Sequence, residues 1–362
     1  MSGKRRVMES LALAVSFVVC AVGASGEGSG TAELTYDAGL KAVTATKALT
    51  FGKALSVRGG TGVIAIGGRT VVVGAERRGS STRFGLDLNG DGKVAGDEWR
   101  SLGRFRSGGF QFALDAGSGG SRKYALALND ISIYLVQGSG ARMGARYWVN
   151  FSHKGTIDGE TIRIIDDDLD GTFTQNGGDG ILIGKARAAV PLMRVHRIGE
   201  YFYRLDVAED GSKIDYARLE NPDLGEVVAP IRTSALKCLV LKGSQSAFDL
   251  KADAKTIAPA GEYRLSYGLL AVGKATVPIK PTELALTYTI KAGQVNTIRI
   301  GAPLTLFFKA SYGDGKISVM PDLRIIGAGG ELYASDFQGT ARPRVAFLAG
   351  NRVAASANMG YG

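Results

Sequence analysis

The chain has 362 residues, of which 45% are hydrophobic and 22% are charged, and its formal net charge is +10. This balance excludes a disordered chain, because the apolar fraction can form a sizeable core. Glycine is frequent, with 52 residues, whereas proline is scarce, with 9. Together with many short runs of Val, Ile, Leu and Tyr, the composition predicts a mainly β protein. We expect several sandwich or sheet domains with few short helices.

The N-terminus has the features of a secretory signal peptide. Lys4, Arg5 and Arg6 precede an apolar run over residues 11–24, and cleavage after Ala24 is expected. The run is shorter than the ~20 residues of a membrane-spanning helix. We therefore expect an exported protein, either secreted, periplasmic or at the cell surface, with no stable membrane span once the signal is removed.

The basic residues are scattered along the chain rather than gathered in one run. For an exported protein this pattern predicts no nucleic-acid partner. Two interpretations remain: an ordinary solvated surface, or contact with an anionic cell-envelope polysaccharide. Another protein is a further candidate partner. Cys238 is the single cysteine outside the signal segment, and its apolar neighbours predict a buried thiol in a strand.

The most informative stretch is the twelve residues from Asp87 to Glu98. Oxygen-bearing side chains occupy positions 1, 3, 5 and 12, and glycine occupies position 6. This is the ligand spacing of an EF-hand calcium loop, since Ca²⁺ takes roughly 6–8 oxygen ligands and glycine permits the sharp turn. The alternative is a polar turn without metal. The predicted ligands are Asp87, Asn89, Asp91, the carbonyl oxygen of Lys93, and Glu98.

A full EF-hand domain has a long helix on each side of its loop. Here a strand over residues 83–86 is expected to lead into the loop. One helical turn over residues 98–102 is expected to follow, before Gly103 ends it. The sequence therefore predicts the calcium loop without the helix–loop–helix domain.

A second acidic segment follows a predicted strand over residues 161–165. Aspartates repeat positions 1, 3 and 5 and glycine repeats position 6, but position 12 is glycine instead of glutamate. Carboxylates crowded this closely repel one another unless a cation neutralises them. The alternative is an acidic turn that binds no metal. The predicted ligands of a second Ca²⁺ are Asp166, Asp168, Asp170, the carbonyl oxygen of Thr172, and Asp179, with Asn176 as a further candidate.

The segment over residues 221–230 indicates a domain boundary, because it contains two prolines between strand-like runs. We expect four regions. These are the signal peptide at 1–24, a β-rich domain at 25–225 with both acidic loops, a β-sandwich module at 226–300, and C-terminal strands at 301–362. The last strands form either a second sandwich or the completion of the first.

Residues Pro259, Gly261, Tyr263 and Leu265 form the pattern P-x-G-x-Y-x-L. This pattern resembles carboxypeptidase-regulatory-like (prealbumin-like) sandwich modules. The resemblance implies that proline and glycine shape the turn into a strand and that the tyrosine packs inward. As a whole, the chain resembles secreted bacterial proteins that combine EF-hand-type loops with β-sandwich modules, a resemblance that implies no activity.

Motifs for catalysis are missing from the sequence. His153 and His196 are the only histidines, and neither accompanies a G-x-S-x-G or H-E-x-x-H motif. The sequence thus predicts a non-enzymatic calcium-binding protein with a structural or interaction role. One alternative is a glycan-binding adhesion module with Trp99 or Trp148 in an exposed aromatic strip. The other is a hydrolase with two facing acids in a cleft, or with His153 beside a nucleophile.

Overall fold

The protein is built almost entirely of β-strands, as the sequence predicts. In the described part of the chain, the one helical element is the 3₁₀ turn η1 (Gly96–Glu98). No helix there is long and apolar enough to cross a membrane. The predicted signal peptide lies outside the described residues. The computed structural model describes residues 28–38, 47–50, 59–78, 81–101, 108–115, 121–136, 140–149, 151–186, 188–229, 236–250, 255–272, 275–307, 310–313, 316–319, 324–333, 344–349 and 352–358.

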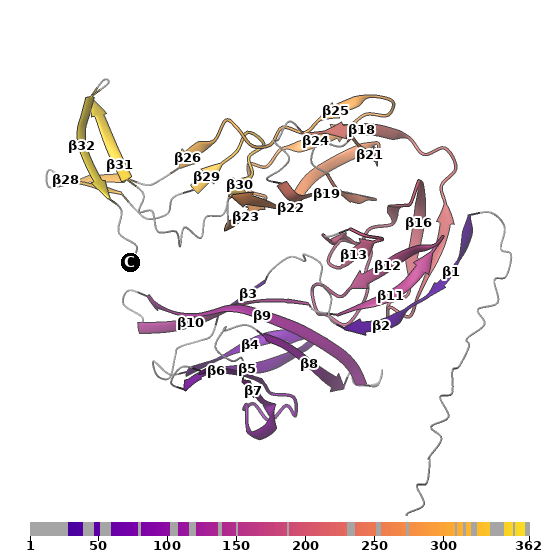
Figure 1. Cartoon of the computed structure of the whole chain (residues 1–362), viewed down its shortest axis with the longest axis horizontal. Coiled ribbons are helices and arrows are strands. Elements are labelled where there is room, and N and C mark those ends of the chain that lie inside the picture. Colours follow the sequence, from indigo (N-terminus) through magenta and orange to yellow (C-terminus); the bar gives the residue numbers. More distant parts are fainter. Residues whose placement is uncertain are drawn as a thin grey trace, which may run out of the picture.

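A central unit of two sheets carries the second acidic loop (Figure 1). Inward-facing aliphatic and aromatic residues of both sheets form one core, which includes Ile162, Ile164 and Leu205. The first sheet contains, in order, β1 (Ser29–Glu33), β17 (Lys213–Arg218), β16 (Tyr201–Val207) and β15 (Val195–Ile198). The second contains β14 (Val190–Pro191), β13 (Gly180–Ile183), β12 (Glu160–Ile165), β11 (Phe151–Ile157) and β2 (Thr35–Ala38).

An insertion into this central unit carries the first acidic loop. Strands β2 and β11 pair directly, with Ala38 opposite Phe151, although more than a hundred residues separate them in sequence. The intervening chain forms two further sheets below the central unit in Figure 1. One contains β3 (Lys47–Thr50), β10 (Gly140–Val149), β9 (Ser121–Val136) and β8 (Gly108–Asp115). The other contains β4 (Gly59–Ile66), β5 (Arg69–Arg78), β6 (Ser81–Leu86) and β7 (Trp99–Ser101).

The helical turn predicted over residues 98–102 is wrong, because Trp99 opens strand β7 opposite Gly85. Packing explains the difference. A Cβ atom on Gly74 would lie 2.7 Å from the indole, so glycine there leaves the slot that the ring occupies. The Arg83 guanidinium lies 4.4 Å from the centroid of the same ring. A strand holds the indole in this slot, and only the three residues before it remain helical.

The C-terminal unit pairs a large sheet with a small one. Their shared core contains Leu239, Leu241 and the inward-packed Tyr263, and Cys238 is buried in a strand, as predicted. The large sheet runs β20 (Ala247–Asp249), β19 (Leu236–Gly243), β22 (Gly261–Val272), β23 (Ala275–Lys280), β30 (Leu332–Tyr333), β29 (Arg324–Ile326) and β26 (Thr305–Phe307), with β24 (Thr287–Ile290) on β22. The small sheet contains β21 (Thr256–Pro259), β18 (Leu224–Val228) and β25 (Val295–Thr297).

Strands on both sides of residue 300 therefore share one sheet, through the pairing of β23 with β30. Two hairpins complete the described chain. They are β27 (Ala310–Gly313) with β28 (Lys316–Val319), and β31 (Arg344–Ala349) with β32 (Arg352–Asn358).

Replacing Gly155 with valine tests how β11 packs against the β1–β2 connection. A Cβ atom at this position would lie 2.6 Å from the backbone oxygen of Glu33 and 2.6 Å from Leu34. Because backbone cannot easily give way, we expect Gly155→Val to destabilise the fold by about 1–3 kcal/mol. The matched control Thr156→Val, at the exposed next position, should change stability by less than about 0.5 kcal/mol. Equal thermal unfolding of both variants would contradict this packing.

Candidate metal centre

The first acidic loop closes on itself through backbone-to-side-chain hydrogen bonds. The carboxylate of Asp87 accepts the N–H of Gly92 at 2.8 Å. The Asn89 side-chain oxygen accepts the N–H of Asp91 at 2.9 Å, and the Asp91 carboxylate accepts the N–H of Lys93 at 2.9 Å. Loop position 1 is thus bonded to position 6, position 3 to position 5, and position 5 to position 7. The winding does not bring the carboxylates of Asp87, Asp91 and Glu98 together into a metal-ligating group.

The closing glutamate of this loop faces backbone amides. Glu98 Oε1 accepts the N–H groups of Leu88 and Asn89, at 2.7 and 3.2 Å, and Oε2 accepts the N–H of Ala95 at 3.0 Å. Asp87 is buried, whereas most of the other loop residues are exposed. Glu98 would have to exchange these hydrogen bonds for metal contacts in order to act as the predicted ligand.

The second acidic loop repeats the same three hydrogen bonds. The Asp166 carboxylate accepts the N–H of Gly171 at 3.0 Å, and the Asp168 carboxylate accepts the N–H of Asp170 at 3.2 Å. Asp170 in turn accepts the N–H and the hydroxyl of Thr172, at 2.7 and 2.8 Å. The shared winding extends the sequence similarity of the two loops to their backbone geometry.

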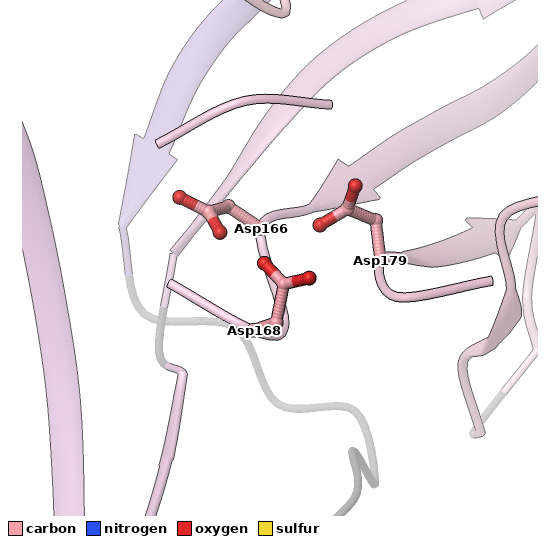
Figure 2. Close-up of side chains that lie close together, drawn as sticks. All are labelled: Asp166, Asp168 and Asp179. Atoms are coloured by element: carbon pink, nitrogen blue, oxygen red, sulfur yellow. The ribbon is translucent and has the colours of Figure 1, made fainter. Parts of the chain in front are cut away.

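Strand pairing brings the late aspartate of the second loop to the first one. Asp166 directly follows β12 and Asp179 directly precedes β13, and these strands pair with Ile165 opposite Gly180. The two aspartates therefore lie just beyond the last pair of this ladder. With Asp168 they form a triad whose carboxylate oxygens lie within 4.8 Å of one another, the single such acidic group within the described residues. Figure 2 shows the three carboxylates gathered around one space.

The triad contains two buried oxygens that have no hydrogen-bond donor. Asp166 and Asp179 are each only 2% exposed. One oxygen of each is satisfied, by the N–H of Gly171 and by the N–H of Thr174 at 2.6 Å. The other oxygen, Oδ1 in both residues, is buried without a hydrogen-bond partner. A buried carboxylate oxygen is costly unless a hydrogen bond or a cation compensates for its lost hydration.

The electrostatics of the triad disfavour its ionised form when no cation is present. Burial, followed by repulsion from Asp168 and Asp170, raises the pKa of Asp166 to about 7. Burial is also the main cause that raises the pKa of Asp179 to about 8, and Asp166, Asp168 and Asp170 add repulsion. Nearby N–H groups lower both pKa values without cancelling these effects. A divalent cation between the carboxylates would reverse the balance, because opposite charge favours ionisation.

The structure brings some of the predicted ligands of the second loop together and leaves others apart. Asp166, Asp168 and Asp179 come together, whereas Asp170 lies outside the triad and bonds to Thr172. The Asn176 side-chain oxygen accepts the N–H of Gly178 at 2.8 Å. Two supporting residues escaped the sequence analysis: Thr174, which bonds to Asp179, and Gly178, where a Cβ atom would lie 2.5 Å from Asp168 Oδ2. In the sequence, the adjacent glycines at 177–178 were the feature that could have indicated a close approach to the loop carboxylates.

Hydrogen bonds tie the second loop to segments from all three units. Phe173, inside the loop, also packs in the central core. The bonds join the Gly67 N–H to the Leu169 carbonyl (2.6 Å), the Phe173 N–H to the Glu209 carbonyl (2.9 Å), the Gln175 side chain to the Leu205 carbonyl (2.6 Å), and the Lys242 ammonium to the Asn176 carbonyl (2.8 Å). The loop is thus a junction of the fold.

Residues considered for other chemistry make local contacts where the structure describes them. His153 lies in β11 and bonds to the Gly211 carbonyl at 2.7 Å. His196 lies in β15, and its Nε2 accepts the N–H of Met193 at 2.9 Å. Trp99 is half-buried beneath Arg83, and the side chain of Trp148 lies outside the described part. The Asp210–Gly211 segment is a hairpin turn between β16 and β17, as predicted.

No protein-family model, curated protein or solved structure matches this chain. The geometry and chemistry of the two loops are therefore the basis on which a function can be proposed.

Proposed function

We propose that the chain is an exported calcium-binding protein with a structural or interaction role and no catalytic one. In this proposal Ca²⁺ occupies the second loop and stabilises the strand connections that meet there. One observation carries the proposal: Asp166 and Asp179, buried at the ends of paired strands, each hold a buried oxygen without a hydrogen-bond partner, and their carboxylates lie close to one another and to that of Asp168.

The chemistry of the donors favours calcium over softer metals. The triad offers carboxylate oxygens alone, and hard cations such as Ca²⁺ prefer oxygen ligands, whereas zinc and copper sites commonly use sulfur or imidazole. Three carboxylates leave room in a coordination shell of roughly 6–8 oxygens. Asp170, the Thr172 carbonyl and water are the proposed remaining ligands. The EF-hand-like hydrogen bonds of the loop support the same cation.

The first loop is proposed as a second and weaker calcium site. Its ligands would be Asp87, Asn89, Asp91, the Lys93 carbonyl and Glu98. The loop is mostly exposed, and Glu98 must give up its hydrogen bonds to backbone amides before it can bind a cation. Binding there is therefore opposed by the loss of these hydrogen bonds, whereas Oδ1 of Asp166 and of Asp179 in the second loop has no hydrogen bond to lose. Extracellular calcium modules commonly bind at about 10⁻⁴–10⁻³ M.

Calcium should raise the melting temperature of the mature protein relative to protein in a chelator. At a calcium concentration about 100 times the dissociation constant, binding to the folded state alone contributes ~2.7 kcal/mol. For a chain of this size we expect a rise of roughly 3–5 °C. Scanning calorimetry measures the shift, and titration calorimetry measures the heat and the stoichiometry. Identical melting with calcium and with chelator, together with no heat of binding, would overturn the proposal.

Two double variants test which of the two acidic loops produces the calcium-induced rise in melting temperature. Asp166→Asn/Asp179→Asn keeps the side-chain shapes but removes two charges, so it should abolish most of the calcium-induced rise in melting temperature. Asp87→Ala/Glu98→Ala, at the first loop, should leave that rise largely intact and lose only the weaker binding. The reverse assignment, with the first-loop variant losing the stabilisation, would contradict the ranking of the two sites.

Gly178→Ala probes the position of Asp168 without altering a ligand. The new methyl group would lie 2.5 Å from Asp168 Oδ2, so the carboxylate must move away from its place in the triad. We expect weaker calcium binding at the second loop by about tenfold, with the metal-free melting temperature little changed. An unaltered dissociation constant in titration calorimetry would show that Asp168 is not a ligand.

Without calcium, the stability of the protein should fall as pH rises from about 4 to about 8. The folded pKa values of Asp166 and Asp179, about 7 and about 8, lie above the ordinary value of 3.8. In this window the folded state binds more protons than the unfolded state, so raising the pH favours unfolding. Melting in chelator at pH 5.5 and pH 8.5 tests the sign.

Calcium and the Asp166→Asn/Asp179→Asn change should each remove much of this pH dependence, since calcium holds the carboxylates ionised and asparagine does not titrate. Calcium binding near pH 6 should also release protons, which titration in buffers of different ionisation enthalpy detects. A metal-free protein that gains stability between pH 5.5 and 8.5 would contradict the electrostatics of the triad.

A further inference from the structure

A cavity of about 610 Å³ lies where the central unit meets the C-terminal unit. Its walls come from β13 and β15 on one side and from β19, β20 and β21 on the other. This volume lies in the range of about 300–1,000 Å³ that is usual for small-molecule sites, which often form between domains. The calcium proposal does not use this cavity.

Apolar side chains make up about half of the lining. They include Ile181 and Ile183 from β13, Phe248 from β20, and Ile257 and Pro259 from β21. The lining residues include no Asn, Gln, Trp or Tyr. The apolar part of the lining suits an aliphatic ligand body.

Positive charge surrounds the same cavity. Lys185, Arg197 and Lys237 are exposed, come from three different segments, and have no ion-pair partner among the described residues. A fourth cation, Lys255, pairs with Glu226 at 3.0 Å. The four basic residues outnumber the two acidic lining residues, Glu160 and Asp249. The lining therefore carries a formal excess of two positive charges, which suits an anionic head group.

His196 adds a buried donor to this lining. The residue is 1% exposed, and its Nε2 accepts the N–H of Met193. The proton of the neutral ring therefore lies on Nδ1, for which the described residues supply no acceptor. Burial lowers the pKa of His196 to about 4, so the ring stays neutral and can donate to a ligand oxygen.

We propose that this cavity binds an amphiphile with one anionic head group, a carboxylate or a phosphate, and an aliphatic body. The body packs against the apolar lining, and the head group lies among Lys185, Arg197 and Lys237. This site is independent of calcium at the acidic loops.

Titration calorimetry of the mature protein with decanoate, below its micelle concentration, tests the proposal. Decanoate should bind with one-to-one stoichiometry. Decyl maltoside and decyltrimethylammonium, which keep the chain but change the head group, should bind at least about tenfold more weakly. Trigalacturonate, an anionic saccharide without an aliphatic body, should not bind. Saturable binding of trigalacturonate in place of decanoate would overturn the proposal in favour of an acidic polysaccharide.

Variants locate the binding. Arg197→Gln/Lys237→Gln should weaken decanoate binding by about tenfold. Ala186→Trp, at an exposed lining position, should block the cavity and abolish binding. Because the position is exposed, the change should not destabilise the hydrophobic core. The control Lys154→Gln/Lys280→Gln removes two exposed lysines outside the lining and should leave binding unchanged. Undiminished binding in the Ala186→Trp protein would overturn the proposal.

Vesicles of phosphatidylglycerol separate a free amphiphile from a membrane lipid. Co-sedimentation that disappears with Arg197→Gln/Lys237→Gln, together with decanoate binding, would assign the head group to a lipid. Decanoate binding without co-sedimentation would assign it to a free amphiphile. Co-sedimentation without decanoate binding would overturn the cavity as the site.

Discussion

The structure depends on how two negative charges are accommodated at the ends of β12 and β13. The strand ladder that pairs Ile165 with Gly180 places Asp166 and Asp179 side by side, and the surrounding core excludes water from both. In each carboxylate one oxygen accepts a backbone N–H, and the other oxygen, Oδ1, has no hydrogen-bond partner. Protons or a cation can relieve this arrangement, and a hard divalent cation fits its oxygen donors best.

The position of the second loop makes its occupancy important for the whole chain. The loop bonds to the β4–β5 turn of the insertion through Gly67, to β16 through Leu205, and to β19 of the C-terminal unit through Lys242. A cation that fixes the loop therefore also fixes these connections. The described chain contains one buried thiol and no disulfide, so the proposed cation would add to the stability that core packing supplies.

Local features of the sequence predicted where the two loops lie, whereas the pairing of strands distant in sequence could not be predicted from it. The strands that lead into both loops, the Asp210–Gly211 hairpin turn and the buried Cys238 follow from local patterns and are found. Asp179 was among the predicted ligands, but its position beside Asp166 depends on the β12–β13 register, which local spacing does not show. The insertion between β2 and β11, the conversion of residues 99–101 into β7, and the cavity all arise from contacts between distant segments. No short pattern encodes them.

Hydrogen–deuterium exchange of the mature protein, with calcium and with a chelator, tests the central claim most directly. Calcium should slow exchange in peptides that cover residues 166–180, where backbone N–H groups bond to the triad carboxylates. It should also slow exchange in the contacting segments around Gly67, Leu205 and Glu209, because the loop joins them. Identical exchange in the two conditions across residues 166–180 would contradict a calcium-stabilised junction.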